Sequence, residues 1–202
     1  MGGDNSPDAT LNGAYLASQY LGEKETIVLV GDEKLAKSWF KSNNIDSSVF
    51  EFIHADDVIS MNEHATKALR KKPNNSISVG FNALKNKEID VFSSAGNSGA
   101  MLVGSMFSIG PIKGVIRPSI TSVLPKKNGG VGLILDVGVN ADCKPDVLFQ
   151  FAILGSLFAE NVYNSGLDRC SQYYASRIDR VCIFGDNNRV FSSQFCINGD
   201  KV

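Results

Sequence analysis

The sequence predicts an α/β fold in which a mostly parallel sheet is covered by helices on both faces. Short apolar runs typical of buried strands alternate along the chain with stretches of helical periodicity. Turns of glycine and polar residues stand between strand and helix at two places, which is the usual form of a ligand site in α/β proteins. The length of 202 residues is enough for one domain with a sizeable core.

The individual elements follow from this alternation in chain order. Helices are predicted where apolar residues recur at helical spacing, over residues 9–21, 33–42, 63–70, 76–87 and 101–109, and from residue 145 to about 163. Strands are predicted at the short apolar runs 26–30, 49–54, 90–94, 119–124 and 131–135. Segments 70–75 and 125–130 are rich in Lys, Pro, Asn and Gly, so we expect exposed loops there.

The first polar junction is the sequence AGNSGA at residues 95–100, between a predicted strand and a predicted helix. Its two glycines free the backbone to approach a ligand, and Asn97 or Ser98 can cap the helix. First-turn amides together with the helix dipole then form a receptor for an anion such as phosphate. The alternative is a turn that only caps the helix. The spacing matches neither a Walker loop nor a dinucleotide-binding fingerprint.

The second polar junction, DVGVNADCKPD at residues 136–146, lies between an apolar run and a helix start at Pro145. Lys144 can neutralise an anion, Asn140 can donate a hydrogen bond to it, and Asp142 can orient Lys144 or move a proton. Alternatively, Asp142 and Lys144 form a surface pair beside a helix cap. Cys143 is interpreted as a small buried residue, because no histidine base stands beside it in sequence.

Composition and charge favour a cytoplasmic protein without a nucleic-acid partner. The formal net charge of −1 lacks the basic excess of a nucleic-acid surface. The polar start predicts no secretory signal, and the longest apolar segment, residues 100–112, is broken by polar residues and is too short to span a bilayer. The cysteines have no C-x-x-C spacing, so neither a zinc site nor a redox pair is indicated. We expect no metal and no cofactor.

The succession of motifs resembles one family, the bacterial phosphate acyltransferases known as PlsX. The motifs are MGGDNSP at 1–7, HADDVI at 54–59, KALRKK at 67–72, SAGNSGA at 94–100, RP at 117–118, LP at 124–125 and the 136–145 stretch. The resemblance implies a three-layer α/β/α fold related to isopropylmalate dehydrogenases and phosphotransacetylases. It also implies a reaction of phospholipid synthesis, in which inorganic phosphate attacks an acyl thioester on acyl carrier protein and forms acyl phosphate.

The resemblance assigns roles to the two junctions and to the opening turn. Asp4 and Asn5 either line the phosphate cleft or only fix a turn, and the basic run 67–72 either steers the acidic carrier or is a solvated helix face. The expected phosphate-binding residues are Gly96, Asn97, Ser98, Gly99, Asp4 and Asn5, and the expected catalytic residues are Asn140, Asp142 and Lys144.

Compared with the family pattern, the chain is expected to be truncated. Family members have a strand before the Gly-Gly turn and continue for about as long again, so residues 1–164 are expected to be an acyltransferase-like domain. Residues 165–202 are expected to be a non-matching tail, from a frameshift or as a natural variant. Family members form homodimers and associate peripherally with membranes through the half expected to be missing. Two alternatives remain: a phosphotransacetylase-like enzyme acting on acyl-coenzyme A, and an inactive fragment that only binds phosphate or carrier.

Overall fold

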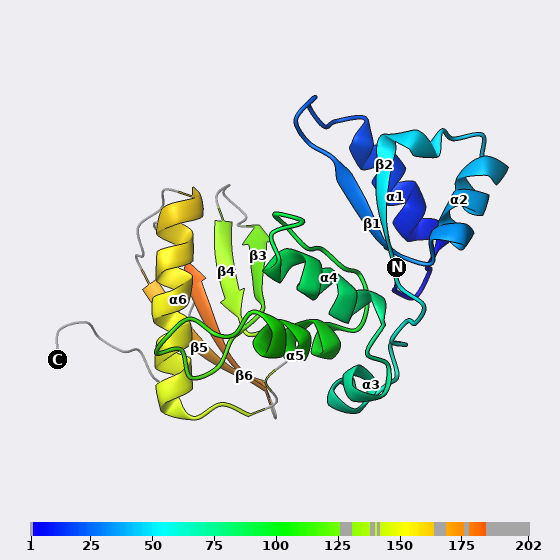
Figure 1. Cartoon of the computed structure of the whole chain (residues 1–202). Helices are drawn as coiled ribbons and strands as arrows, with labels where there is room; N and C mark the ends of the chain where they lie inside the picture. The colour runs from blue at the N-terminus through cyan, green and yellow to red at the C-terminus, as the bar shows by residue number, and fades with distance from the viewer. Residues whose placement is uncertain are drawn as a thin grey trace. The chain divides into compact units, whose positions relative to one another are not determined.

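The computed structural model describes residues 2–125, 131–137, 140 and 142–163, together with the backbone of residues 169–175 and 178–184. The chain divides into two compact units, Met1–Pro111 and Ile112–Val202. Figure 1 shows helices and strands in both units. The structure therefore confirms a mixed α/β protein, with one parallel strand pair and one antiparallel sheet among the described strands.

The first part of the N-terminal unit is a parallel strand pair with two helices. Strand β1 (Ile27–Gly31) pairs with β2 (Phe50–His54). A parallel pair needs a crossover, which α2 (Glu33–Ser42) and the short 3-10 helix η1 (Ser47–Val49) supply. Helix α1 (Asp8–Ser18) packs its buried Leu11 into the same core, where the Phe40 and Phe50 rings stack with centroids 4.8 Å apart. This packing fixes the carboxyl ends of β1 and β2.

Three helices complete this unit around a second apolar cluster. Helices α3 (Ala65–Lys71), α4 (Ser76–Lys85) and α5 (Ser98–Ser108) enclose the side chains of Ile59, Ala68, Ile77, Phe81 and Ala100. The close packing depends on small residues, since a Cβ added at Gly80 would lie 2.3 Å from the Phe92 ring. The cluster holds the N-terminal end of α5, where Ala100 is fully buried.

The predicted strand at residues 90–94 is wrong, because the structure has no strand there. Val91 is 80% exposed, whereas the Phe92 ring packs edge-on against Phe81 with centroids 5.0 Å apart. One apolar side chain therefore holds the segment, and its two adjacent apolar residues, Val91 and Phe92, do not reflect strand pairing.

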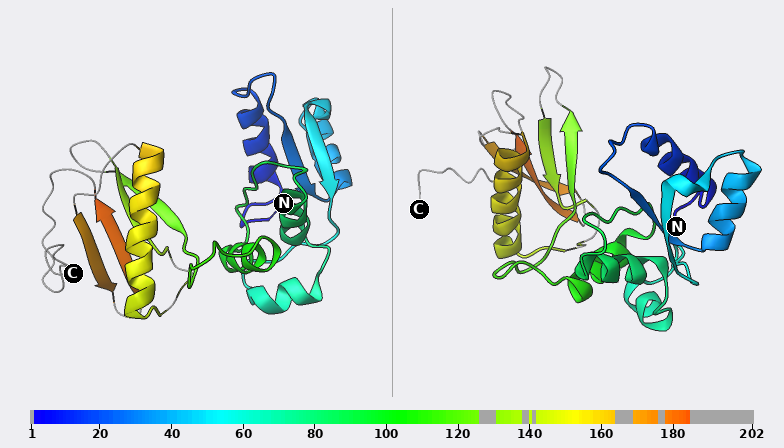
Figure 2. Two further views of the ribbon diagram at one scale, coloured as in Figure 1. Left: turned by 60° about the vertical axis from the view of Figure 1, so that its left-hand side comes forward. Right: turned by 45° about the horizontal axis from the view of Figure 1, so that its top comes forward.

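The C-terminal unit contains an antiparallel sheet in the order β3-β4-β6-β5. Its strands are β3 (Thr121–Pro125), β4 (Val131–Leu135), β5 (Arg169–Ala175) and β6 (Ile178–Phe184). Both views of Figure 2 show helix α6 (Pro145–Tyr163) lying along this sheet. Phe151 of α6 is fully buried against Leu133 and Leu135 of β4. Strands β5 and β6 lie within the stretch 165–202 that the sequence sets apart as a tail.

The prediction of a mostly parallel sheet is wrong for the described strands of this unit. Only the five residues 126–130 connect β3 to β4, and parallel neighbours need a crossover of a dozen or more residues. The short connection therefore forces an antiparallel hairpin, with Thr121 opposite Leu135. The expected loop at 125–130 lies, beyond Pro125, outside the described residues.

The observed bounds of the other elements agree closely with the predicted ones. Helix α2 and strand β4 have the predicted bounds, whereas α1 ends three residues before the predicted end at residue 21. Among the described residues, none of the helices has the length and apolar character needed to cross a membrane.

Candidate functional site

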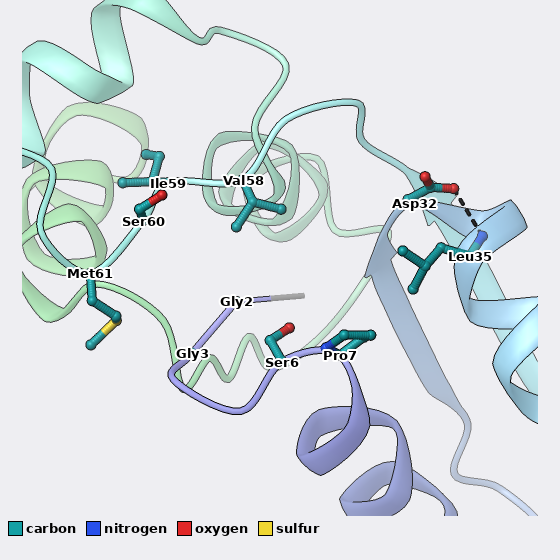
Figure 3. A pocket seen from close by; sticks show the side chains of 10 residues that line it. All are labelled: Gly2, Gly3, Ser6, Pro7, Asp32, Leu35, Val58, Ile59, Ser60 and Met61. Atoms are coloured by element: carbon teal, nitrogen blue, oxygen red, sulfur yellow. Dashed lines mark hydrogen bonds between the residues drawn. The ribbon is translucent and has the colours of Figure 1, made fainter.

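A pocket of about 310 Å³ lies beside the carboxyl ends of β1 and β2 (Figure 3). Three segments form it: the opening turn, the start of α2, and the loop after β2. Its lining residues are Gly2, Gly3, Ser6, Pro7, Asp32, Leu35, Val58, Ile59, Ser60 and Met61. Asp32 caps α2 by accepting a hydrogen bond from the Leu35 amide at 3.0 Å. The carboxyl ends of parallel strands are where α/β proteins bind ligands.

The opening turn lies directly against the glycine turn at residues 95–96. A Cβ added at Gly3 would be 3.0 Å from the Ala95 carbonyl oxygen, and one at Gly2 would be 3.5 Å from the Gly96 Cα. Gly3 also has a φ of 130°, which disfavours other residues. The structure thus brings together two motifs that are about 90 positions apart in the sequence. Glycine is needed here for both conformation and close approach.

Asp4 and Asn5 lie at the tip of this opening turn. Both side chains are exposed, and within the described residues the pocket is lined instead by Gly2, Gly3 and Ser6. The Asn5 carbonyl accepts from the Ala9 amide at 3.0 Å, which starts α1. The backbone contacts favour the turn-fixing role of this segment.

The first turn of α5 presents open backbone donors. The Asn97 side chain caps the helix, because its Oδ1 accepts from the Ala100 amide at 3.0 Å. The Gly96 amide donates to the Ser94 hydroxyl at 3.1 Å. In the part of the chain that the structure describes, the amides of Ser98 and Gly99 donate to no protein acceptor. Unsatisfied amides that are aligned with a helix dipole are donors of the kind that bind anions.

The Asn97 side chain also binds the loop after β2, a contact that its sequence position did not indicate. The side chain is 7% exposed, and its Nδ2 donates to the carbonyls of Ser60, Met61 and Glu63 at 3.0–3.2 Å. Both ends of the side-chain amide are therefore engaged within the protein. Because these partners lie 34 to 37 positions earlier, no local sequence signal indicates them.

An ion pair also fixes the loop after β2, residues 58–63, whose carbonyls accept from Asn97. The Lys72 ammonium lies 2.8 Å from Glu63 Oε2 and donates to the Val58 carbonyl at 2.9 Å. The Glu63 carboxylate also accepts from the Ser60 amide at 2.7 Å. The hydrogen bond from Lys72, and then that from Ser60, hold the pKa of Glu63 below its ordinary value. Neither Lys72 nor Glu63 was among the predicted site residues.

The carboxyl end of β2 carries a second polar pair. His54 Nε2 lies 2.8 Å from Asp56 Oδ1, and Asn74 donates to the other carboxylate oxygen. These contacts, that with His54 first, lower the pKa of Asp56. The pair connects the end of β2 to the turn that precedes α4.

The second polar junction lies in the C-terminal unit and divides into a buried and an exposed part. Asn140 is 8% exposed, and its Nδ2 donates to the Pro118 carbonyl and to Asp136 Oδ2, both at 3.1 Å. Asp136 is fully buried and accepts from the Ile120 amide at 2.8 Å. Asn140 and Asp136 therefore fix the end of β4 against the start of β3.

Asp142 and Lys144, by contrast, are exposed. Among the described residues they form no ion pair with each other, so the alternative of a surface pair between them is not observed. The Lys144 carbonyl accepts from the Val147 and Leu148 amides at the start of α6, and the Asp142 carbonyl accepts from Arg117 at 3.1 Å. Cys143 is buried, as expected.

These features define an α/β protein in which a helix N-terminus presents two backbone amides that are unpaired among the described residues, in the same unit as a parallel strand pair. The chain belongs to the family described as Fatty acid synthesis protein, which matches residues 1–172. This match confirms the resemblance to the PlsX acyltransferases.

Several curated relatives are named phosphate acyltransferase. The chain is 42% identical over 162 residues to that of Acetivibrio thermocellus, covering 80% of this chain and 47% of the relative. It is 36% identical over 168 residues to that of Herpetosiphon aurantiacus, covering 83% and 45%. For Thermoanaerobacterium thermosaccharolyticum the identity is 40% over 164 residues, covering 81% and 47%. The chain spans about half the length of these relatives.

Proposed function

We propose that this chain carries the phosphate-binding part of a phosphate acyltransferase. The proposed reaction converts acyl-acyl carrier protein and inorganic phosphate to acyl phosphate for phospholipid synthesis. It is supported by family membership and by the names of the relatives. The single observation that carries the proposal is the open first turn of α5, where the Ser98 and Gly99 amides meet no protein acceptor in the described part of the chain.

Phosphate suits this receptor and needs no protein nucleophile. A phosphate oxygen forms a bond to the thioester carbonyl carbon, the carbon–sulfur bond breaks, and the carrier thiolate takes up a proton. Backbone amides held by folded structure stabilise the anion without reorganising, and a cleft positions the two reactants. In this proposal Gly96 and Gly99 allow the close approach, and Asn97 orders the donors through its cap.

The proposed roles at the second junction follow from exposure and contacts. In this proposal the exposed Lys144 neutralises negative charge on phosphate or on the thioester oxygen. Asp142 forms no ion pair with Lys144 among the described residues, so of its two expected roles, orienting Lys144 or moving a proton, we propose the second. Asn140, whose side chain is engaged with Asp136 and Pro118, contributes by holding this junction in shape. Asp4 and Asn5 act through the opening turn.

The partners are likewise part of the proposal. We infer an acidic acyl carrier protein as acyl donor, inorganic phosphate as acceptor, and a cytoplasmic homodimer peripheral to the membrane in the full-length protein. Because the chain spans about half of each relative, a second candidate function is binding of phosphate or carrier without turnover.

A thioester assay tests the proposal. Decanoyl-acyl carrier protein is incubated with the 202-residue chain, with and without inorganic phosphate, and release of carrier thiol is followed. Phosphate-dependent release supports the acyltransferase, whereas phosphate binding without release supports the second candidate. Decanoyl-coenzyme A in place of the carrier tests a phosphotransacetylase-like activity. Use of the acidic carrier should fall more steeply with salt, because electrostatic steering is screened.

A further inference from the structure

Lys72 differs from the other basic residues of the run 67–72. Lys67, Arg70 and Lys71 are exposed, whereas the Lys72 side chain is 31% exposed. Its ammonium meets two acceptors, the Val58 carbonyl at 2.9 Å and Glu63 Oε2 at 2.8 Å. This geometry distinguishes Lys72 from a solvated helix face and directs it into the loop after β2.

That loop, residues 58–63, is a wall of the pocket. Val58, Ile59, Ser60 and Met61 line the pocket, as Figure 3 shows. The loop is closed on itself, because Glu63 Oε2 accepts from the Ser60 amide at 2.7 Å and the Glu63 amide donates to the Ser60 carbonyl at 3.1 Å. Lys72 therefore fixes the loop at both ends, through Val58 and through Glu63.

The same loop is also tied to the first turn of α5. Asn97 Nδ2 donates to three loop carbonyls, and Asn97 Oδ1 caps α5 through the Ala100 amide. One side chain thus connects the pocket wall to the residues that present the open amides. A shift of residues 60–63 changes the cap and with it the direction of those amides.

We propose that Lys72 is a positioning residue of the phosphate site, fixing loop 58–63 and, through Asn97, the first turn of α5. The inference rests on the proposed function of that turn. Lys72 acts in two ways. It holds the loop by two hydrogen bonds, and it compensates the Glu63 carboxylate, whose residue contacts Asn97 through its carbonyl at 3.0 Å. Without Lys72, an uncompensated carboxylate near the receptor repels an incoming anion.

The test compares Lys72→Gln with Lys85→Gln in the full chain. Lys85→Gln makes the same change of charge at an exposed position of α4. The Lys85 side chain forms no hydrogen bond or ion pair among the described residues. Inorganic phosphate is titrated by calorimetry, and hydrogen exchange is measured on peptides covering residues 58–63 and 97–101. A charge-assisted hydrogen bond gives a larger effect than a neutral one, so Lys72→Gln should weaken phosphate binding about three- to tenfold.

Two further variants separate positioning from general destabilisation. Lys72→Arg keeps the charge and the donors, so it should recover most of the affinity. Adding Glu63→Gln to Lys72→Gln removes the uncompensated carboxylate and should recover part of it. Faster exchange in both peptides, with a global thermal midpoint equal to that of Lys85→Gln, supports the inference.

Equal phosphate affinity of Lys72→Gln and Lys85→Gln, while the wild-type chain binds, overturns the inference and leaves the proposed function standing. Unchanged exchange in the 97–101 peptide overturns the connection through Asn97. Failure of the wild-type chain to bind phosphate overturns the proposed function and this inference together.

Discussion

A proline at position 98 removes one backbone donor from the proposed receptor and little else. Ser98 is the first residue of α5, where proline is well tolerated because the missing N–H has no intrahelical partner. Asn97, which would precede the proline, has ψ of 110°, outside the helical region that a following proline disfavours. Ser98→Pro should therefore leave the helix intact.

The expected loss follows from the kind of bond removed. A hydrogen bond to a charged group contributes about 1.5–3 kcal/mol, which corresponds to roughly ten- to hundredfold weaker phosphate binding. Ser98→Ala is the matched control, because it removes the hydroxyl and keeps the amide. Calorimetric titration with inorganic phosphate gives the affinities, and thermal unfolding checks the fold. Equal binding by Ser98→Pro and Ser98→Ala, with both folded, would refute the assignment of the Ser98 amide.

Three further predictions concern packing, a buried carboxylate and acid sensitivity. Gly80→Ala should lower stability by about 1–2 kcal/mol, because its Cβ would lie 2.3 Å from the Phe92 ring. Gly13→Ala, with open space around it, should raise stability by about 0.5–1 kcal/mol; equal effects in thermal unfolding would contradict the packing argument. Asp136→Asn should destabilise the C-terminal unit by about 2 kcal/mol, since the fully buried carboxylate accepts backbone hydrogen bonds; an unchanged urea midpoint would count against this. Because the pKa of Glu63 is lowered, its ion pair with Lys72 stabilises the fold fully above the ordinary pKa of 4.5 and loses this effect as the pH falls below it. Glu63→Gln should therefore flatten the acidic part of the pH–stability curve. A curve identical to that of the wild-type chain would contradict a stabilising role of the ion pair.

Local signals in the sequence predicted much of the secondary structure. The polar cap and apolar periodicity of residues 33–42 gave the bounds of α2, and the glycine turn before α5 is capped by Asn97, one of the two expected residues. The apolar run 131–135 forms β4 as expected. These elements are determined by residues within a few positions of one another, which is why sequence patterns predict them.

Contacts between distant segments explain what the sequence did not predict. The apolar pair Val91 and Phe92 suggested a strand at 90–94, but the segment packs through the Phe92 ring alone. The length of the 126–130 connection, rather than the order of elements along the chain, decides the direction of β4. The site shows the same limitation. Asn97 was predicted as a phosphate ligand from its place in the turn, yet its side chain is engaged by carbonyls of the loop after β2. Likewise, nothing in the basic run marks Lys72 as the member that pairs with Glu63.

The most direct test of the central claim is an NMR titration of the ¹⁵N-labelled 202-residue chain with inorganic phosphate, with chloride at equal ionic strength as control. The proposed site predicts saturable amide shifts that are largest at Ser98 and Gly99, accompanied by smaller shifts at Gly2 and Gly3 of the opening turn. Absence of saturable shifts at Ser98 and Gly99, or saturable shifts confined to residues outside the first turn of α5, would contradict the claim that this helix N-terminus binds phosphate.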